Sequence, residues 1–435
     1  MGTPHHAGVH GQAPAAEERF PIRIRQSFAP NTRGTLFLSR RMVLFVVMMS
    51  ISISGSLFAQ AVSREWLILV YVSGINNRGL DGSAKEVIHL LEKEGSSDAV
   101  TVLVKYGLLE MGPNGEVQFP RQLITLILQK NTKDQAINSS VVDSSPHQDM
   151  ASKTSLSWFA SHGIKAYPSK KVMLLFFGKG EGWMGLGEDE ISQKKMGIVT
   201  LAETLKEIYE KTGKKIDLFV MDADCMQTTE VVYELREWAE IIVGSEEKGP
   251  RVGYFYDLVL QEVKADPAMN AEKLANAFVR YADNPVNSAV KTEKLPAFLT
   301  LLDKWVDAVT KDPVAMKTAA EEAKKTFSFA LKESIDLCEY IERISQALSD
   351  QHPAVKAGRE LCRFTEEDLL LSYHKTLFSL DAGKVILRPE YDRAKGLAIY
   401  LPQLSYDSSM YEQLAFPSNS KWRGFMELLS NEFTQ

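Results

Sequence analysis

The chain has 435 residues, of which 45% are hydrophobic and 24% charged, proportions typical of a globular protein with a sizeable core. Its formal net charge is −6, and because residues 1–61 hold six arginines against two glutamates (+4), the remainder carries −6 − 4 = −10. An acidic chain of this kind argues against a nucleic-acid partner, which would require a basic face.

The N-terminal region predicts an export signal. Arg40 and Arg41 precede an apolar run at residues 43–53, and small residues follow up to the Ala-Gln-Ala sequence at 59–61. A basic segment, an apolar segment and a small-residue cleavage site form a secretory signal, and the apolar run is short for a membrane span. We therefore predict a disordered leader or a later translation start at residues 1–41, a signal peptide at 42–61, and an exported chain without a membrane span. A retained signal anchor is the alternative.

Apolar strands alternate with helices over the next two hundred residues. Strands are predicted at residues 66–72, 100–104, 123–128, 172–177, 216–221 and 241–244. Helices are predicted around residues 84–91, 156–164, 201–209 and 231–239. The third of these helices is expected to begin at a capping box formed by Thr200 and Glu203 and to end at Gly213, whereas polar residues 136–153 are expected to form an exposed loop. Continuous apolar strands that alternate with helices predict a largely parallel sheet covered on both faces.

The pattern becomes mainly helical from residue 270 to 361, and residues 376–387 and 396–401 are expected to return as strands. We therefore predict an α/β domain at 64–265 and a mainly helical region at 266–435. The three cysteines are too few for a disulfide scaffold, although Cys338 and Cys362 could pair if their helices form a hairpin. The histidines are scattered and no metal-binding motif occurs, so no metal or cofactor is expected.

Three segments together indicate a family. Residues 66–77 read WLILVYVSGINN, residues 174–183 read LLFFGKGEGW, and residues 221–235 read MDADCMQTTEVVYEL. These segments, with KGLAIYLP at 395–402, resemble the clostripain-like cysteine peptidases, relatives of caspases, gingipains and legumain. The resemblance covers about residues 64–428. It implies a caspase-like α/β/α sandwich with a largely parallel sheet and a mainly helical C-terminal extension.

The same resemblance places the family's histidine at Lys179 and its cysteine at Asp224 when both motifs are aligned without gaps. A cysteine peptidase requires a thiolate and a base that also returns a proton to the leaving amine. A lysine remains protonated unless it is strongly desolvated, and an aspartate has no thiol. We therefore expect the catalytic pair to be lost, and we predict an ion pair between Lys179 and Asp224. The alternative is two separately solvated charges.

Two neighbouring residues could still act in the cleft. Cys225 is the alternative nucleophile, but it lies one residue beyond the expected position, and one step along an extended strand turns a side chain to the opposite side. Otherwise it is a small buried residue. Asp222 matches the family aspartate that lines the pocket for a basic P1 side chain, and it could hold Arg or Lys without cleavage. Its alternative role is to cap the following helix.

These observations lead to an expectation that leans against enzymatic activity. We expect an exported, catalytically inactive relative of clostripain that binds a peptide or protein partner, one with basic side chains if the Asp222 pocket persists. The first alternative is an active cysteine endopeptidase that uses Cys225 and prefers Arg or Lys at P1. The second is a structural protein of the cell envelope.

Overall fold

The computed structural model describes most of the chain after the predicted signal. The described residues are 64–73, 80–111, 117–132, 137–146, 149–189, 192–250, 252–331, 333–381, 384–402 and 408–433. They all belong to one compact unit that spans residues 60–435. The leader and signal predicted at 1–61 lie outside the described residues. No helix among the residues described is long and apolar enough to cross a membrane.

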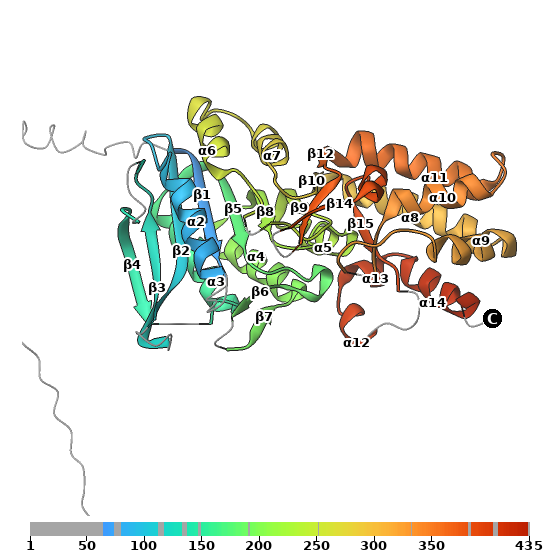
Figure 1. Ribbon diagram of the computed structural model, residues 1–435, viewed down its shortest axis with the longest axis horizontal. Coiled ribbons are helices and arrows are strands. Elements are labelled where there is room, and N and C mark those ends of the chain that lie inside the picture. Colours follow the sequence, from blue (N-terminus) through green and yellow to red (C-terminus); the bar gives the residue numbers. More distant parts are fainter. Residues whose placement is uncertain are drawn as a thin grey trace, which may run out of the picture. The chain divides into compact units, whose positions relative to one another are not determined.

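A nine-stranded sheet forms the centre of this unit, with the strand order β12-β10-β9-β8-β5-β1-β2-β3-β4 (Figure 1). Its strands are β1 (Arg64–Val72), β2 (Val100–Met111), β3 (Val117–Ile127), β4 (Ser140–Pro146), β5 (Ser169–Phe177), β8 (Ile216–Asp222), β9 (Ala239–Ser245), β10 (Val286–Lys291) and β12 (Leu370–Lys375). The five central strands from β9 to β2 are parallel, and antiparallel pairs complete each edge. The predicted largely parallel sheet is therefore confirmed.

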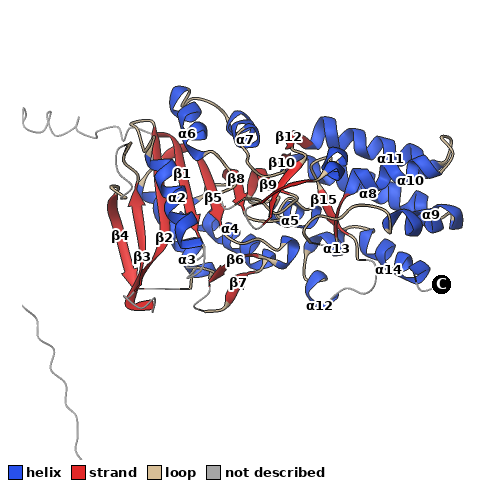
Figure 2. Cartoon of the chain, in the orientation of Figure 1, coloured by secondary structure: helices blue, strands red, loops and turns tan. Residues whose placement is uncertain are grey.

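Helices cover both faces of the sheet (Figure 2). One face carries α2 (Leu80–Glu92), α6 (Tyr256–Ala265) and α7 (Ala271–Arg280); the other carries α3 (Lys153–Ala166), α4 (Ile198–Thr212) and α5 (Thr229–Leu235). Strand β1 is continuously apolar because both of its faces are buried. Leu67 and Leu69 belong to the core on one face of the sheet, and Ile68 and Val70 belong to the core on the other. Burial on both sides removes the polar alternation that a half-exposed strand would show.

The C-terminal region extends one of these two cores. Its helices are α8 (Leu295–Thr310), α9 (Pro313–Ala323), α10 (Leu337–Ala347), α11 (Pro353–Phe364), α12 (Ser408–Tyr411), α13 (Ala415–Asn419) and α14 (Trp422–Phe433). Trp305 of α8 packs against Trp422 and Phe425 of α14, with ring centroids 6.3 and 5.5 Å apart. Two two-stranded sheets accompany these helices: β11 (Ser334–Asp336) with β15 (Ala398–Tyr400), and β13 (Phe378–Asp381) with β14 (Lys384–Leu387). A third, β6 (Leu186–Asp189) with β7 (Lys194–Met196), lies between β5 and α4 in the chain.

The structure corrects three local predictions. Residues 140–146, predicted to lie in a loop, form the edge strand β4, whose backbone pairs with β3 while most of its side chains, including those of Val141 and Val142, face solvent. Helix α5 ends at Leu235, before the predicted 239, because Ala239 already begins β9. Strand β10 interrupts the region that was predicted to be helical, and its backbone pairs with β9.

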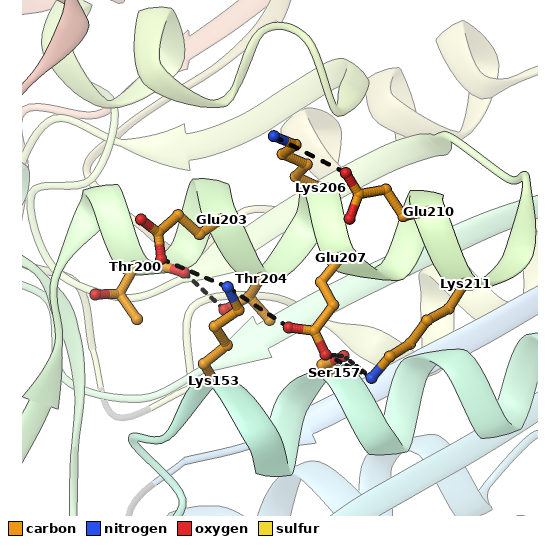
Figure 3. A network of polar contacts seen from close by, with 9 residues as sticks. All are labelled: Lys153, Ser157, Thr200, Glu203, Thr204, Lys206, Glu207, Glu210 and Lys211. Carbon is orange, nitrogen blue, oxygen red and sulfur yellow. Dashed lines mark hydrogen bonds and ion pairs between the residues drawn. The ribbon is translucent and has the colours of Figure 1, made fainter.

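The predicted capping box at Thr200 and Glu203 is also wrong, because α4 begins earlier, at Ile198, with Gly197 as its N-cap. Figure 3 shows these residues inside a polar network that joins α3 to α4. Glu203 lies 3.5 Å from the amine of Lys153, and the Ser157 hydroxyl donates to Glu207 over 2.8 Å. Glu203 therefore links α4 to α3 through an ion pair and does not cap α4. The predicted stop at Gly213 is confirmed, since this C-cap has a left-handed φ of 68°.

Candidate functional site

The candidate site is formed by two turns at the carboxyl ends of neighbouring parallel strands. Strands β5 and β8 pair so that Phe177 lies beside Asp222, the last residue of each. The turn after β5 carries Lys179, and the turn after β8 carries Asp224. A Cβ atom placed on Gly180 would lie only 2.1 Å from the carbonyl oxygen of Asp224, so the two turns are in direct backbone contact. The sheet thus brings the two sequence motifs together.

Lys179 does not form the predicted ion pair with Asp224. Its amine lies 2.8 Å from a carboxylate oxygen of Glu188 and 3.4 Å from one of Glu181, and half of its side chain is exposed. The hydrogen bond to Glu188 is the main reason why the pKa of Lys179 is raised above its ordinary value. The prediction fails because Glu181 in the same turn and Glu188 on β6 supply nearer carboxylates. The charge of Lys179 still lowers the pKa of Asp224, as the smallest of several contributions.

Asp224 is half-buried beside the loop that follows β9. One of its carboxylate oxygens accepts a hydrogen bond of 3.0 Å from the backbone N–H of Gly249. Burial raises the pKa of this carboxyl, and the negative charge of Glu247 acts in the same direction. The position that the resemblance assigns to a nucleophilic thiol therefore holds a carboxylate anchored to the backbone.

The thiol of Cys225 is enclosed by protein. The residue is 2% exposed and has a left-handed φ of 58°, which is uncommon outside glycine. Strand β8 already ends at Asp222, so it is a turn, and not the alternation of an extended strand, that directs this side chain inward. Burial raises the pKa of the thiol, and the charges of Glu247 and Asp224 raise it further. Within the described part of the chain, no hydrogen bond joins this thiol to a histidine.

Asp222 is buried, with an exposed fraction of 6%. Its carboxylate accepts hydrogen bonds from the backbone N–H of Gly253, at 3.2 and 3.1 Å, and from the hydroxyl of Tyr256. Burial is the largest cause of a pKa raised to about 7, and the negative charge of Asp224 adds to it, while the hydrogen bonds from Tyr256 and Gly253 oppose it. The alternative role as a helix cap is wrong, because the N-cap of α5 is Thr228.

Sequence reasoning gave no role to Glu247, which organises the wall of the site. Its carboxylate accepts from the backbone N–H of Ala330 at 3.0 Å and from the hydroxyl of Tyr391 at 2.5 Å, and its backbone carbonyl accepts from the N–H of Cys225 at 3.4 Å. The backbone N–H of Leu331, the residue after Ala330, contacts the Cys225 thiol. A segment of the C-terminal region therefore covers the sulfur. The only sequence signal was the Ser-Glu-Glu motif at 245–247, which does not reveal partners this distant.

Comparisons with known proteins agree with this geometry. The family model of the clostripain family matches residues 70–428. The chain is similar in structure to a secreted C11 cysteine protease from Bacteroides thetaiotaomicron in complex with an irreversible peptide inhibitor, with a TM-score of 0.59, 17% identity, and coverage of 82% of this chain and 99% of that one. It is also similar to an inactive zymogen C11 protease from Parabacteroides distasonis, with a TM-score of 0.55, 18% identity, and coverage of 82% and 97%.

No curated protein matches the chain. The structural likeness, at these identities, establishes the fold, which is the caspase-like arrangement of a largely parallel sheet between helices with further helices at the C-terminus. The family model spans most of the sequence, including both motifs whose turns meet at Gly180. The chain therefore belongs to the clostripain family.

Proposed function

We propose that this protein is a catalytically inactive member of the clostripain family that binds a peptide or protein partner. The observation that carries the proposal is the state of Cys225, the sulfur next to the position of the expected nucleophile. This thiol is 2% exposed, its pKa is raised, and it lies among carboxylates. Catalytic cysteines lie in the opposite environment, where positive charge lowers the pKa of the thiol and a base is within reach.

The residue at the histidine position cannot replace the base. Lys179 is held by two carboxylates, and its raised pKa keeps it protonated at neutral pH. A protonated amine cannot accept a proton from a thiol. The cover formed by Ala330 and Leu331 adds a second obstacle, because a substrate carbonyl would have to displace it to reach the sulfur.

The charges that oppose catalysis favour a basic partner. Asp224 is half-buried and Asp222 lies behind it, fully engaged by Gly253 and Tyr256. Because Asp224 is the more exposed of the two carboxylates, a lysine or arginine side chain would meet it before Asp222, and a charge-assisted hydrogen bond would form there. Recognition through Asp222 would require displacement of the Tyr256 hydroxyl.

A comparison of the wild type with Cys225→Ala tests the loss of activity. Both proteins are incubated with fluorogenic peptides that carry Arg or Lys at P1, and with a thiol-reactive peptide inhibitor. We expect no turnover by the wild type above that of the variant, and no labelling of Cys225 in the folded protein. Turnover that disappears in Cys225→Ala would refute the proposal and establish a cysteine endopeptidase.

Calorimetric titration with Lys- and Arg-containing peptides tests the binding role. We expect binding that weakens about tenfold or more in Asp224→Asn, and the matched control is Asp392→Asn, whose side chain is 77% exposed in the C-terminal region. Absence of binding to the wild type would favour the structural role in the cell envelope.

We also propose export, supported by the predicted signal and by the description of the similar B. thetaiotaomicron protease as secreted. The N-terminal sequence of the protein expressed in a bacterial host tests this. A mature chain that begins after residue 61 is expected, and an uncleaved chain in the membrane fraction would indicate a signal anchor.

A further inference from the structure

We infer that Cys338 and Cys362 are a redox-active thiol pair, which closes to a disulfide by exchange with a small disulfide of the glutathione class. The pair lies on α10 and α11, outside the two turns of the candidate site, and its role is independent of the proposed function. Both cysteines are free thiols in this structure. Two features of the structure support the assignment: the contact between the sulfurs and the open path to one of them.

The packing of α10 and α11 brings the two thiols together. Cys338 is in the first turn of α10 and Cys362 in the last turn of α11. The Cys362 sulfur lies 4.0 Å from the carbonyl oxygen of Cys338, and the two thiols are hydrogen-bond partners. Gly358 makes this approach possible, because a Cβ atom there would lie 2.6 Å from a methyl group of Ile341. The two sulfurs therefore need no large backbone movement to bond.

Only one of the two sulfurs is open to a reagent. Cys338 is 3% exposed, whereas Cys362 is half-buried and lines a cavity of about 770 Å³ between the same two helices. Arg359 and Arg363 line this cavity as well. Arg359 pairs with Asp350, which also lines it, and Arg363 pairs with Glu367 in the short helical segment that follows α11. The cavity is large enough to admit a small peptide, and its lining mixes the two guanidinium groups with the carboxylates of Glu342, Asp350 and Glu366. The geometry thus makes Cys362 the sulfur that reacts first with the external disulfide.

The reaction proceeds by two thiol–disulfide exchanges. The Cys362 thiol loses its proton to solvent, and its thiolate attacks glutathione disulfide, forming a mixed disulfide on Cys362 and releasing one glutathione thiolate. The Cys338 thiol then loses its proton and attacks the Cys362 sulfur, which forms the protein disulfide and expels the second glutathione. Two protein thiols are oxidised, one glutathione disulfide is reduced to two glutathione thiols, and the electrons balance.

Thiol counting on the folded chain tests the pair. The protein is incubated with glutathione disulfide, quenched with acid, unfolded, and titrated for free thiols, and its tryptic peptides are mapped by mass. We expect the free thiols to fall from the three present in the reduced chain to one, Cys225, with a cross-linked peptide two hydrogen masses lighter than its separate halves. Three remaining thiols, or glutathione retained on Cys362 of the wild type, would overturn the inference.

Single substitutions separate the two steps. Cys338→Ala should retain one glutathione on Cys362, because the resolving thiol is absent, whereas Cys362→Ala should leave Cys338 unmodified in the folded protein. Cys225→Ala is the matched control, and it should form the same cross-link as the wild type. Glutathione on Cys338 in Cys362→Ala would contradict the assigned order of attack. The wild-type peptide map keeps the test decisive if either variant fails to fold.

Discussion

The raised pKa of Asp222 predicts a measurable loss of stability as pH rises. A carboxyl with a pKa of about 7 in the folded chain, against an ordinary value of 3.8, is protonated when folded and ionised when unfolded over that interval. The folded state then binds more protons than the unfolded state, so the free energy of unfolding falls as pH rises from about 4 to about 7. At about 1.4 kcal/mol for each pH unit, Asp222 alone contributes a fall of about 4 kcal/mol.

The substitution Asp222→Asn isolates this contribution. The asparagine cannot ionise, and its carbonyl oxygen can still accept the hydrogen bond from the backbone N–H of Gly253. Buried carboxyls elsewhere, including Asp336 with a pKa raised to about 6 and Glu339 with one raised to about 7, act with the same sign in both proteins. The difference between the two pH profiles is therefore the quantity to measure.

Urea unfolding followed by tryptophan fluorescence at pH 4, 5, 6, 7 and 8 provides that comparison. We expect the stability of the wild type to fall more steeply than that of Asp222→Asn, by up to about 4 kcal/mol over the range. Asp392→Asn, at an exposed position, should follow the wild-type profile. Parallel profiles for the wild type and Asp222→Asn would refute the burial that raises the pKa of this carboxyl.

Three further predictions test the remaining contacts. In Gly180→Ala the new Cβ atom would lie 2.1 Å from the carbonyl oxygen of Asp224, so the backbone there must move by about 1.3 Å to reach an ordinary contact of 3.4 Å. Urea unfolding should therefore show a loss of stability of about 1–3 kcal/mol. The control is Gly424→Ala in α14, where a Cβ atom has nothing within 4 Å, and it should gain up to about 1 kcal/mol of stability. Equal stabilities would contradict the contact between the turns. Glu230→Ala removes the buried carboxylate oxygen that accepts hydrogen bonds from the backbone N–H of Tyr400 and the hydroxyl of Tyr411, so its thermal unfolding should indicate a loss of about 2–4 kcal/mol, with a smaller loss for Glu230→Gln. Equal losses would argue against that hydrogen-bonded role. Iodoacetamide should modify Cys225 only after unfolding, and peptide mapping that finds it alkylated in the folded chain would exclude the burial described here.

The central strands were predictable because a strand buried on both faces is apolar along its whole length. The strands around residues 66–72 and 172–177 are apolar throughout, since both faces are covered, and no tertiary detail is needed to recognise them. Gly213 was recognisable for a similar reason, because a left-handed residue at a helix end favours glycine. The meeting of the two motif turns followed from the parallel order of β5 and β8, since carboxyl ends of parallel strands share one edge.

Only the tertiary structure decided which side chains pair with one another in hydrogen bonds and ion pairs. The sequence suggested that Lys179 would face Asp224, but a hairpin beside the turn placed Glu188 nearer. The sequence could not show that the Asp222 carboxylate would accept a hydrogen bond from a backbone N–H 31 residues away, or that Glu247 would bind a tyrosine 144 residues away. Apolar periodicity depends on each residue and its near neighbours, so the sequence by itself determined the central parallel strands of the sheet and the place of the site. The hydrogen bonds and ion pairs of the site depend on which distant segments of the chain pack against it, and only the folded structure determines those segments.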